Sequence, residues 1–237
     1  MSFLVAVVSL IGTIVIFYGS KIIYVKFGKA WLTPMLLTPI VVILILLITD
    51  TSYEKYDVGG SILTNLLGPA TVAFAVPIYK NKALLKKHAV EIIVSITVGS
   101  TVAITSSFLL ALLVGLNDEL THSLVPRSIT TPIAMDISTM IGGSPTLTAV
   151  FVMATGILGG LLAPVLIRAC HFNTPSAKGL MLGMGAHGTG TSKAFEFGEL
   201  EGTFSSLAMV VAALISIVIS TTFFPVFEQL VMNNLLP

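Results

Sequence analysis

Residues 145–168 read PTLTAVFVMATGILGGLLAPVLIR, an apolar run that carries no charge before Arg168. An apolar helix of about 20 residues spans the hydrocarbon core of a bilayer, so this run predicts a membrane-spanning helix. Four further stretches have roughly that length: 3–20, 32–49, 88–115 and 203–227. The whole chain is 55% apolar and 10% charged, whereas a soluble domain carries roughly 25% charged residues. We therefore predict an all-α polytopic membrane protein that forms a single membrane domain over residues 1–237.

The same composition excludes several classes of function. The net charge of +1 gives no reason to expect nucleic acid as a partner. A single cysteine, Cys170, excludes an internal disulfide and a multi-cysteine metal site, and we expect it to be a small buried apolar residue. The sequence offers no nucleophile–histidine arrangement and no paired carboxylates at membrane depth. We therefore predict no enzyme activity, no cofactor and no metal site.

Three stretches do not fit an ordinary spanning helix. Residues 58–79 are apolar but interrupted at Leu67-Gly-Pro-Ala70, and residues 179–197 are interrupted by four glycines. Residues 118–143 are too polar for a plain span and contain Pro126 and Pro132. We predict that both interrupted segments cross the membrane and that 118–143 enters and returns as a hairpin, although a slanted crossing stays open. The total is then about seven to eight transmembrane helices.

The distribution of basic residues predicts the orientation, because cytoplasmic loops are enriched in Lys and Arg. Three loops hold nine of the twelve basic residues: Lys21, Lys26, Lys29, Lys80, Lys82, Lys86, Lys87, Arg168 and Lys178. The loops between them are acidic. A single alternating assignment fits all of them, with the basic loops in the cytoplasm and the N-terminus outside.

The order of elements repeats when the chain is shifted by about 119 residues. The first repeat covers about 30–115 and the second about 145–231, each with a helix, an interrupted helix, a charged loop and a long helix. Three crossings per repeat place the two repeats in opposite orientations. Inverted repeats with interrupted helices are typical of secondary transporters, whose substrate site lies at the interruptions.

Interrupted helices expose unpaired backbone groups, which survive in a membrane only inside protein or around a wet cavity. The second interruption, Gly185-Ala-His-Gly-Thr-Gly-Thr-Ser-Lys193, could hold an anion with its amides and hydroxyls. The first interruption would supply the facing half of the site. The binding residues predicted in these two segments are Asn65, Gly68, Thr71, His187, Gly188, Thr189, Gly190 and Thr191. In the alternative, glycine and proline there merely allow a kink or close packing.

The hairpin supplies the charge. The Arg127 guanidinium matches a carboxylate in shape, and Ser128, Thr130 and Thr131 follow it closely. Alternatively, Arg127 lies at the membrane surface and only helps to fix the topology. Asp136 could form an ion pair with Arg127, carry a proton or have a role at the end of a helix.

Three residues are candidates for coupling a proton to transport: His187, Asp136 and Glu196. Lys193 and Glu196 have the spacing of an ion pair on a helix. The other histidines, His88, His122 and His171, lie at predicted helix ends or in loops, and we expect them to be solvated.

Four motifs together resemble the LrgB/CidB family of bacterial membrane proteins. They are Leu67-Gly-Pro-Ala-Thr-Val-Ala-Phe-Ala-Val-Pro-Ile-Tyr-Lys80, Leu124-Val-Pro-Arg-Ser-Ile-Thr-Thr-Pro-Ile-Ala134, Ile141-Gly-Gly143 and Gly185-Ala-His-Gly-Thr-Gly-Thr-Ser-Lys-Ala194. The resemblance covers about residues 3–230. It implies a multi-pass protein of the bacterial cell membrane, surrounded by membrane lipid.

The resemblance implies two functions. The first is secondary transport of a small monocarboxylate substrate such as glycolate, glycerate or pyruvate. The second is an antiholin or holin-like role, which modulates murein hydrolase export and cell lysis with a small LrgA/CidA-like partner. We expect a homo-oligomer. A pore would need a uniform polar stripe along one long helix, and no helix in this sequence has one, so we favour the transporter.

Overall fold

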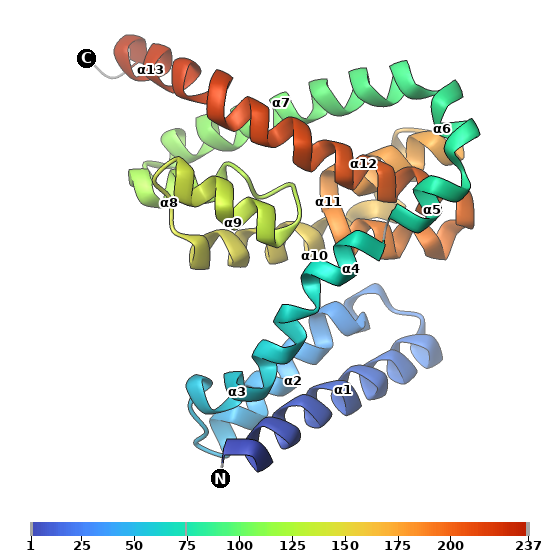
Figure 1. Cartoon of the computed structure of the whole chain (residues 1–237), viewed down its shortest axis with the longest axis vertical. Coiled ribbons are helices and arrows are strands. Elements are labelled where there is room, and N and C mark those ends of the chain that lie inside the picture. Colours follow the sequence, from blue (N-terminus) through green and yellow to red (C-terminus); the bar gives the residue numbers. More distant parts are fainter. Residues whose placement is uncertain (1, 74, 236–237) are drawn as a thin grey trace. The chain divides into compact units, whose positions relative to one another are not determined.

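The computed structural model describes residues 2–73 and 75–235, and these residues form helices without any strand (Figure 1). The all-α prediction is therefore confirmed. The chain divides into two compact units, residues 1–73 and 74–237. The boundary falls inside the first predicted repeat, so the repeat stays a prediction.

The first unit is built on a long helix. Its elements are α1 (Ser2–Phe27), the short 3-10 helix η1 (Ala30–Leu32), α2 (Pro34–Ile48), α3 (Tyr53–Asn65) and α4 (Leu67–Ala73). Helix α1 packs against both α2 and α3. Gly59 lets α3 approach closely, because a Cβ on this residue would lie 2.2 Å from the Ala6 carbonyl oxygen. A hydrogen bond of 3.0 Å between the Thr13 and Tyr56 hydroxyls fixes the same contact.

The second unit contains the remaining helices. They are α5 (Ala75–Lys80), α6 (Lys82–Lys87), α7 (Ala89–Val114), α8 (Asp118–Leu124), α9 (Thr131–Met140), α10 (Pro145–Ala169), α11 (Pro175–Phe197), α12 (Glu199–Val218), the π-helix η2 (Ile219–Phe223) and α13 (Phe224–Leu235). Helices α10, α11 and α12 pack side by side, and α7 lies against α11 and α12.

Four helical stretches are long and apolar enough to cross a membrane: Leu4–Phe27, Ala89–Val114, Pro145–Ala169 and Glu199–Asn234. Helix α2 is a shorter apolar helix. Many large apolar side chains on these helices are exposed, among them Ile48 and Leu113 at more than 80%. An apolar exterior suits hydrocarbon rather than water. The chain is a multi-pass membrane protein.

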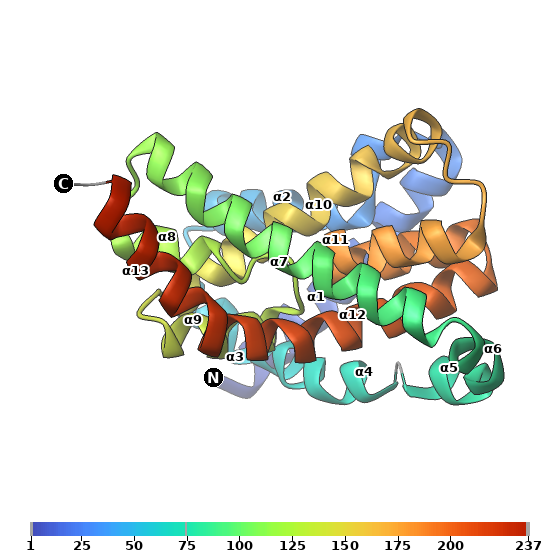
Figure 2. The same cartoon turned by 90° about the horizontal axis from the view of Figure 1, so that it is seen from above.

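The predicted hairpin segment forms two short helices, α8 and α9, while its path relative to the membrane stays a prediction. Helices α8 and α9 have seven and ten residues, or roughly 10 and 15 Å at 1.5 Å per residue, so neither can cross the core alone. Both contact α10. Figure 2 shows that α7 ends and α10 begins at the same end of this unit, with α8 and α9 beside them. The segment between α7 and α10 therefore starts and finishes at the same end of this unit.

Buried side chains from several helices surround the hairpin. One cluster joins Ile96 of α7, Ile137 of α9 and Phe204 of α12. A second joins Phe108 of α7 to Phe224 of α13, whose ring centroids lie 5.2 Å apart in an edge-to-face contact. The hairpin is thus packed inside protein, where its irregular backbone is tolerated.

Two predictions about single residues are wrong. Cys170 is exposed, because it caps the C-terminus of α10 beyond the packed part of the helix. His122 is not solvated: its Nε2 lies 2.6 Å from Glu228 Oε1, and its side chain is 16% exposed. The pair joins α8 to α13, two segments whose proximity the sequence did not indicate.

Candidate functional site

Helix α11 is interrupted at Ala186 and His187, which confirms the predicted break in 179–197. Ala186 has φ −134° and ψ 17°, and His187 has φ 39° and ψ −127°. A positive φ is unfavourable for a residue with a side chain, so the surroundings must hold it. The backbone groups freed by the break then lie at the centre of the second unit.

Glycines hold α11 against its neighbours around this break. A Cβ on Gly183 would lie 2.2 Å from the Ser205 carbonyl oxygen of α12. A Cβ on Gly190 would lie 2.0 Å from the carbonyl oxygen of Leu182, on the other side of the break. The two halves of α11 therefore approach each other more closely than any other residue type would allow.

His187 is buried and bonded on two sides. Its Nε2 donates to the Val152 carbonyl oxygen of α10 at 3.0 Å, because a carbonyl can only accept. The Thr191 hydroxyl donates to the His187 carbonyl oxygen at 2.9 Å and lies 3.0 Å from Ser205 Oγ. The first contact fixes the imidazole, and the second pairs the carbonyl oxygen of a residue in the break.

Arg127 lies at the tip of the hairpin, between the buried Val125 and Ile129. Its Nε donates to Ser107 Oγ of α7 at 3.0 Å, and one terminal nitrogen donates to Thr155 Oγ1 of α10 at 3.4 Å. No carboxylate lies within 4.0 Å of it among the described residues. Neutral hydroxyls therefore orient the guanidinium without neutralising its charge.

A network of hydroxyls fixes the two legs of the hairpin to the first turn of α10. The Thr148 hydroxyl lies 2.7 Å from Ser138 Oγ of α9 and 3.0 Å from the Ser123 carbonyl oxygen of α8. Ser123 Oγ accepts from the Ser144 backbone N–H at 2.7 Å. Because these groups are buried and paired, they set the position at which Arg127 is presented.

Arg127 and the break in α11 meet the same turn of α10. Arg127 contacts Thr155, and His187 contacts Val152, three residues earlier. On the next residue, Gly156, a Cβ would lie 2.6 Å from Thr189 Oγ1 and 2.9 Å from the His187 ring. Three residues are one turn of a helix at most, so the positive charge and the interrupted backbone are close together.

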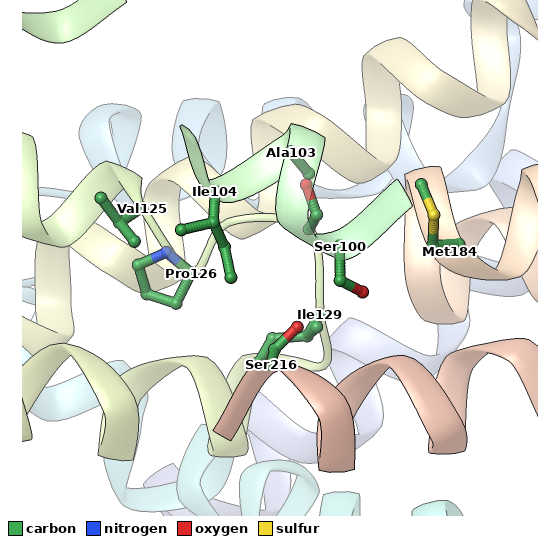
Figure 3. Close-up of a pocket in the computed structure, with 9 residues that line it drawn as sticks. Ser100, Ala103, Ile104, Val125, Pro126, Ile129, Met184 and Ser216 are labelled. Carbon is green, nitrogen blue, oxygen red and sulfur yellow. The ribbon is translucent and has the colours of Figure 1, made fainter. Parts of the chain in front are cut away.

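A small cavity lies beside this cluster (Figure 3). Its volume is about 10 Å³, which is room for about one water molecule. Hydroxyls from three elements line it: Ser100 of α7, Ser128 of the hairpin turn and Ser216 of α12. Figure 3 shows Met184 of α11 beside Ser100, at the edge of the cavity. The other six lining residues are apolar, so the three serines form a small polar spot in an apolar surrounding, next in sequence to Arg127 at Ser128.

The other predicted residues of the hairpin lie close by. Thr130 occupies the N-cap position of α9 and is buried, and its hydroxyl has no hydrogen-bond partner among the residues that the structure describes. Thr131 begins α9. Asp136 is exposed on α9 and forms no ion pair with Arg127, so that pairing is not present.

In the second half of α11, Gly188 has open space around its Cα, and Glu196 is exposed and paired with Lys193. This ion pair was predicted from the spacing and is confirmed. The described residues contain no group of His, Cys, Asp and Glu that could hold a metal ion.

The predicted residues of the first interruption lie in the other unit. Asn65 is the last residue of α3 and is exposed, and Gly68 and Thr71 lie within α4. The interruption predicted at Leu67-Gly-Pro-Ala70 is displaced: α4 runs through Gly68 and Pro69, and the helix is interrupted one residue before this stretch, at Leu66. Proline is tolerated in the first turn of a helix, where its missing N–H would have no partner. That these residues share a site with Arg127 stays a prediction.

Sequence reasoning missed Ser107, Thr155 and Gly156. Ser107 and Ser100 are seven residues apart on one face of α7, which is the only signal that could have found them. Hydroxyls in apolar helices usually bond their own backbone, as Thr105 does with the Thr101 carbonyl oxygen at 2.8 Å. Their presence in the sequence therefore carries little information.

This architecture defines a multi-pass membrane protein in which a pair of short helices and an interrupted helix surround an arginine. Residues 13–226 match the family model described as the LrgB-like family. The protein YwbG of Bacillus subtilis is 47% identical over 213 residues, which cover 90% of this chain and 95% of that protein. The chain belongs to the LrgB-like family, as the motifs indicated.

Two other relatives align over similar fractions of this chain and of their own length. The protein YxaC of Bacillus subtilis is 36% identical over 211 residues, 89% of this chain and 92% of that protein. The holin-like protein CidB of Staphylococcus epidermidis is 35% identical over 217 residues, 92% of this chain and 95% of that protein. Among solved structures there is no significant match.

Proposed function

We propose that this protein is a secondary transporter of small organic anions, with monocarboxylates such as glycolate, glycerate or pyruvate as the substrate class. The observation that carries the proposal is the Arg127 guanidinium, held by two neutral hydroxyls and by no acid within 4.0 Å among the described residues. A charge inside a membrane protein is unfavourable unless it is compensated. A carboxylate substrate would compensate it and accept hydrogen bonds from the guanidinium fork.

The interrupted helix supports the same proposal. Substrates of many transporters bind where a broken helix frees backbone groups. Thr189 and His187 line the side of α10 that Arg127 also contacts, so a small anion there would meet both charge and hydroxyls. Proton coupling through His187, Asp136 or Glu196 belongs to this proposal. Among these, His187 alone is buried beside the site.

The test is uptake of labelled glycolate, pyruvate and acetate into proteoliposomes that contain the purified protein. Arg127→Gln should abolish saturable uptake, and Arg127→Lys should restore only part of it because lysine lacks the planar fork. Arg168→Gln is the matched control. Arg168 is exposed at the end of α10, where it bonds the Pro164 carbonyl oxygen, and its loss should leave uptake unchanged. Equal uptake by wild type and Arg127→Gln would disprove the site.

A second candidate function is a holin-like role with a small LrgA/CidA-like partner. The relatives named holin-like protein CidB support this function more directly than any relative supports monocarboxylate transport. A holin-like assembly should release large dyes from vesicles, alone or with the partner. A transporter should pass small anions and retain the dye. Dye release by the wild-type protein would therefore favour the second function and exclude the first.

A further inference from the structure

An apolar groove in the second unit belongs to no part of the site above. It lies where α5 and α6 meet α7 and α12, and its volume is about 290 Å³. Nine residues line it: Ile78, Lys82, Leu85, Lys86, Ala89, Ile92, Ile93, Leu207 and Val211. Seven of them are apolar and two are lysines, so the groove has a hydrocarbon floor and a positive rim.

The rim is a pair of lysines on one face of α6. Lys82 and Lys86 are four residues apart, which places them on the same side of the helix. No acidic residue lines the groove, and neither lysine forms an ion pair within 4.0 Å among the described residues. Lys82 Nζ lies 4.6 Å from the centroid of the Tyr79 ring, a cation–π contact that leaves its charge in place.

The groove has a fixed position at one end of a spanning helix. The Asn81 side chain donates to Thr203 Oγ1 at 3.3 Å, which attaches the corner between α5 and α6 to α12. Figure 2 shows α5 and α6 at one end of the unit, next to the first turns of α7. Because α7 is long and apolar enough to cross a membrane and begins at Ala89, a membrane crossed by α7 would have its boundary near the two lysines.

We propose that this groove binds one anionic phospholipid, with its phosphate between Lys82 and Lys86 and an acyl chain on the apolar floor. The charges and the floor together select this occupant. Free phosphate would leave the floor uncovered, and a zwitterionic lipid would not compensate the two ammonium charges. Basic pockets beside spanning helices are recognised sites for anionic head groups.

The experiment is native mass spectrometry of the purified full chain in a neutral detergent, with phosphatidylglycerol or phosphatidylcholine added at equal concentrations. We expect one phosphatidylglycerol to stay bound with marked preference. Lys82→Gln with Lys86→Gln should weaken that binding by roughly thirtyfold, which is the effect expected for two basic side chains near a membrane surface. The matched control is Lys80→Gln with Lys87→Gln. It removes the same charge from the same segment, but neither residue lines the groove.

Two further arms separate the possible sources of the anion. Inorganic phosphate at millimolar concentration should not displace the lipid, because it gains nothing from the floor. Ala89→Trp should fill the floor and prevent binding of the lipid even though both lysines remain. The proposal is overturned if the two double variants lose binding equally, if both lipids bind equally well to the wild type, or if inorganic phosphate displaces the lipid.

Discussion

The two interrupted helical segments were equivalent in the sequence and are different in the structure. Between α3 and α4, the interruption is a single residue, Leu66, with ordinary helical angles of φ −80° and ψ −8° and a side chain that is 55% exposed. In α11, the interruption comprises Ala186 and His187, both buried, and His187 has a positive φ. The first is a weak bend on a surface of its unit, and the second is a true break in a packed centre.

The difference shows what turns an interruption into a site. Backbone groups released by a break need partners, and in a membrane those partners must come from the protein or from a ligand. At His187 the carbonyl oxygen accepts from the Thr191 hydroxyl, the imidazole bonds α10 at Val152, and Arg127 bonds α10 at Thr155. Around Leu66 the backbone is almost regular, so few groups are released. We therefore assign the anion site to α11 and the hairpin, and the following substitutions test that contrast.

The largest expected effect is that of Gly190→Ala. The added methyl group would lie 2.0 Å from the Leu182 carbonyl oxygen, and backbone cannot move away as a side chain can. Overpacking of this kind costs about 3 kcal/mol and would force the two halves of α11 apart. We expect a clearly lower thermal unfolding temperature in detergent and loss of anion uptake.

Two matched variants separate this clash from the general effect of alanine. A Cβ on Gly68 or on Gly188 would meet no atom of the described residues within 4 Å. Both are in helices, where alanine is favoured over glycine by about 1 kcal/mol, so both substitutions should be neutral or slightly stabilising. If Gly190→Ala is as stable as these two, the halves of α11 do not approach as described.

A smaller effect is expected from Thr191→Val. The change keeps the shape of the side chain but removes the hydroxyl that bonds the His187 carbonyl oxygen and Ser205 Oγ. Leaving these buried groups unpaired should lower the free energy of unfolding by about 1–2 kcal/mol. Thr191→Ser keeps the hydroxyl and should restore most of the loss. Thr64 is exposed beside the other interruption, and there the same change to valine should alter the free energy of unfolding by no more than about 0.5 kcal/mol.

The main features of the fold were predictable because each depends on residues within one segment of the sequence. The length of apolar runs indicated α7, α10 and α12, and the prolines and polar residues of 118–143 indicated the hairpin. The glycines of 179–197 indicated a break, but the break lies at Ala186 and His187, neither of which is glycine. Contacts with α10 and α12 determine that position, and such contacts leave no local trace in the sequence.

The site was only partly predictable for the same reason. Arg127 and His187 stood out because charge and imidazole are rare at membrane depth. Ser107 and Thr155, which orient the guanidinium, looked like ordinary hydroxyls of apolar helices; Ser107 also donates to its own helix, at 2.6 Å to the Ala103 carbonyl oxygen. The break predicted at Gly68-Pro69 was misplaced because a conspicuous local pattern was misleading there. Residues that usually end helices lie there in a first turn, where they are tolerated.

The smallest expected effect concerns the difference in stability between a glycine and an alanine variant at each interruption. This difference should have opposite signs at residues 187 and 66. Glycine adopts a positive φ without strain, whereas alanine does not, so His187→Gly should be more stable than His187→Ala by about 1 kcal/mol. Both variants lack the imidazole, so their difference reports the backbone alone. At Leu66 the angles are helical, and there Leu66→Ala should be more stable than Leu66→Gly by about the same amount.

The measurement is thermal or denaturant unfolding of the four variants in one detergent, each compared with its partner at the same position. Opposite signs at 187 and 66 would support a strained break in α11 and a relaxed bend between α3 and α4. If alanine is the better residue at both positions, then His187 does not hold a left-handed conformation. In that case α11 is a continuous helix, the backbone groups near Arg127 are already paired with each other, and the arginine alone would have to bind the anion.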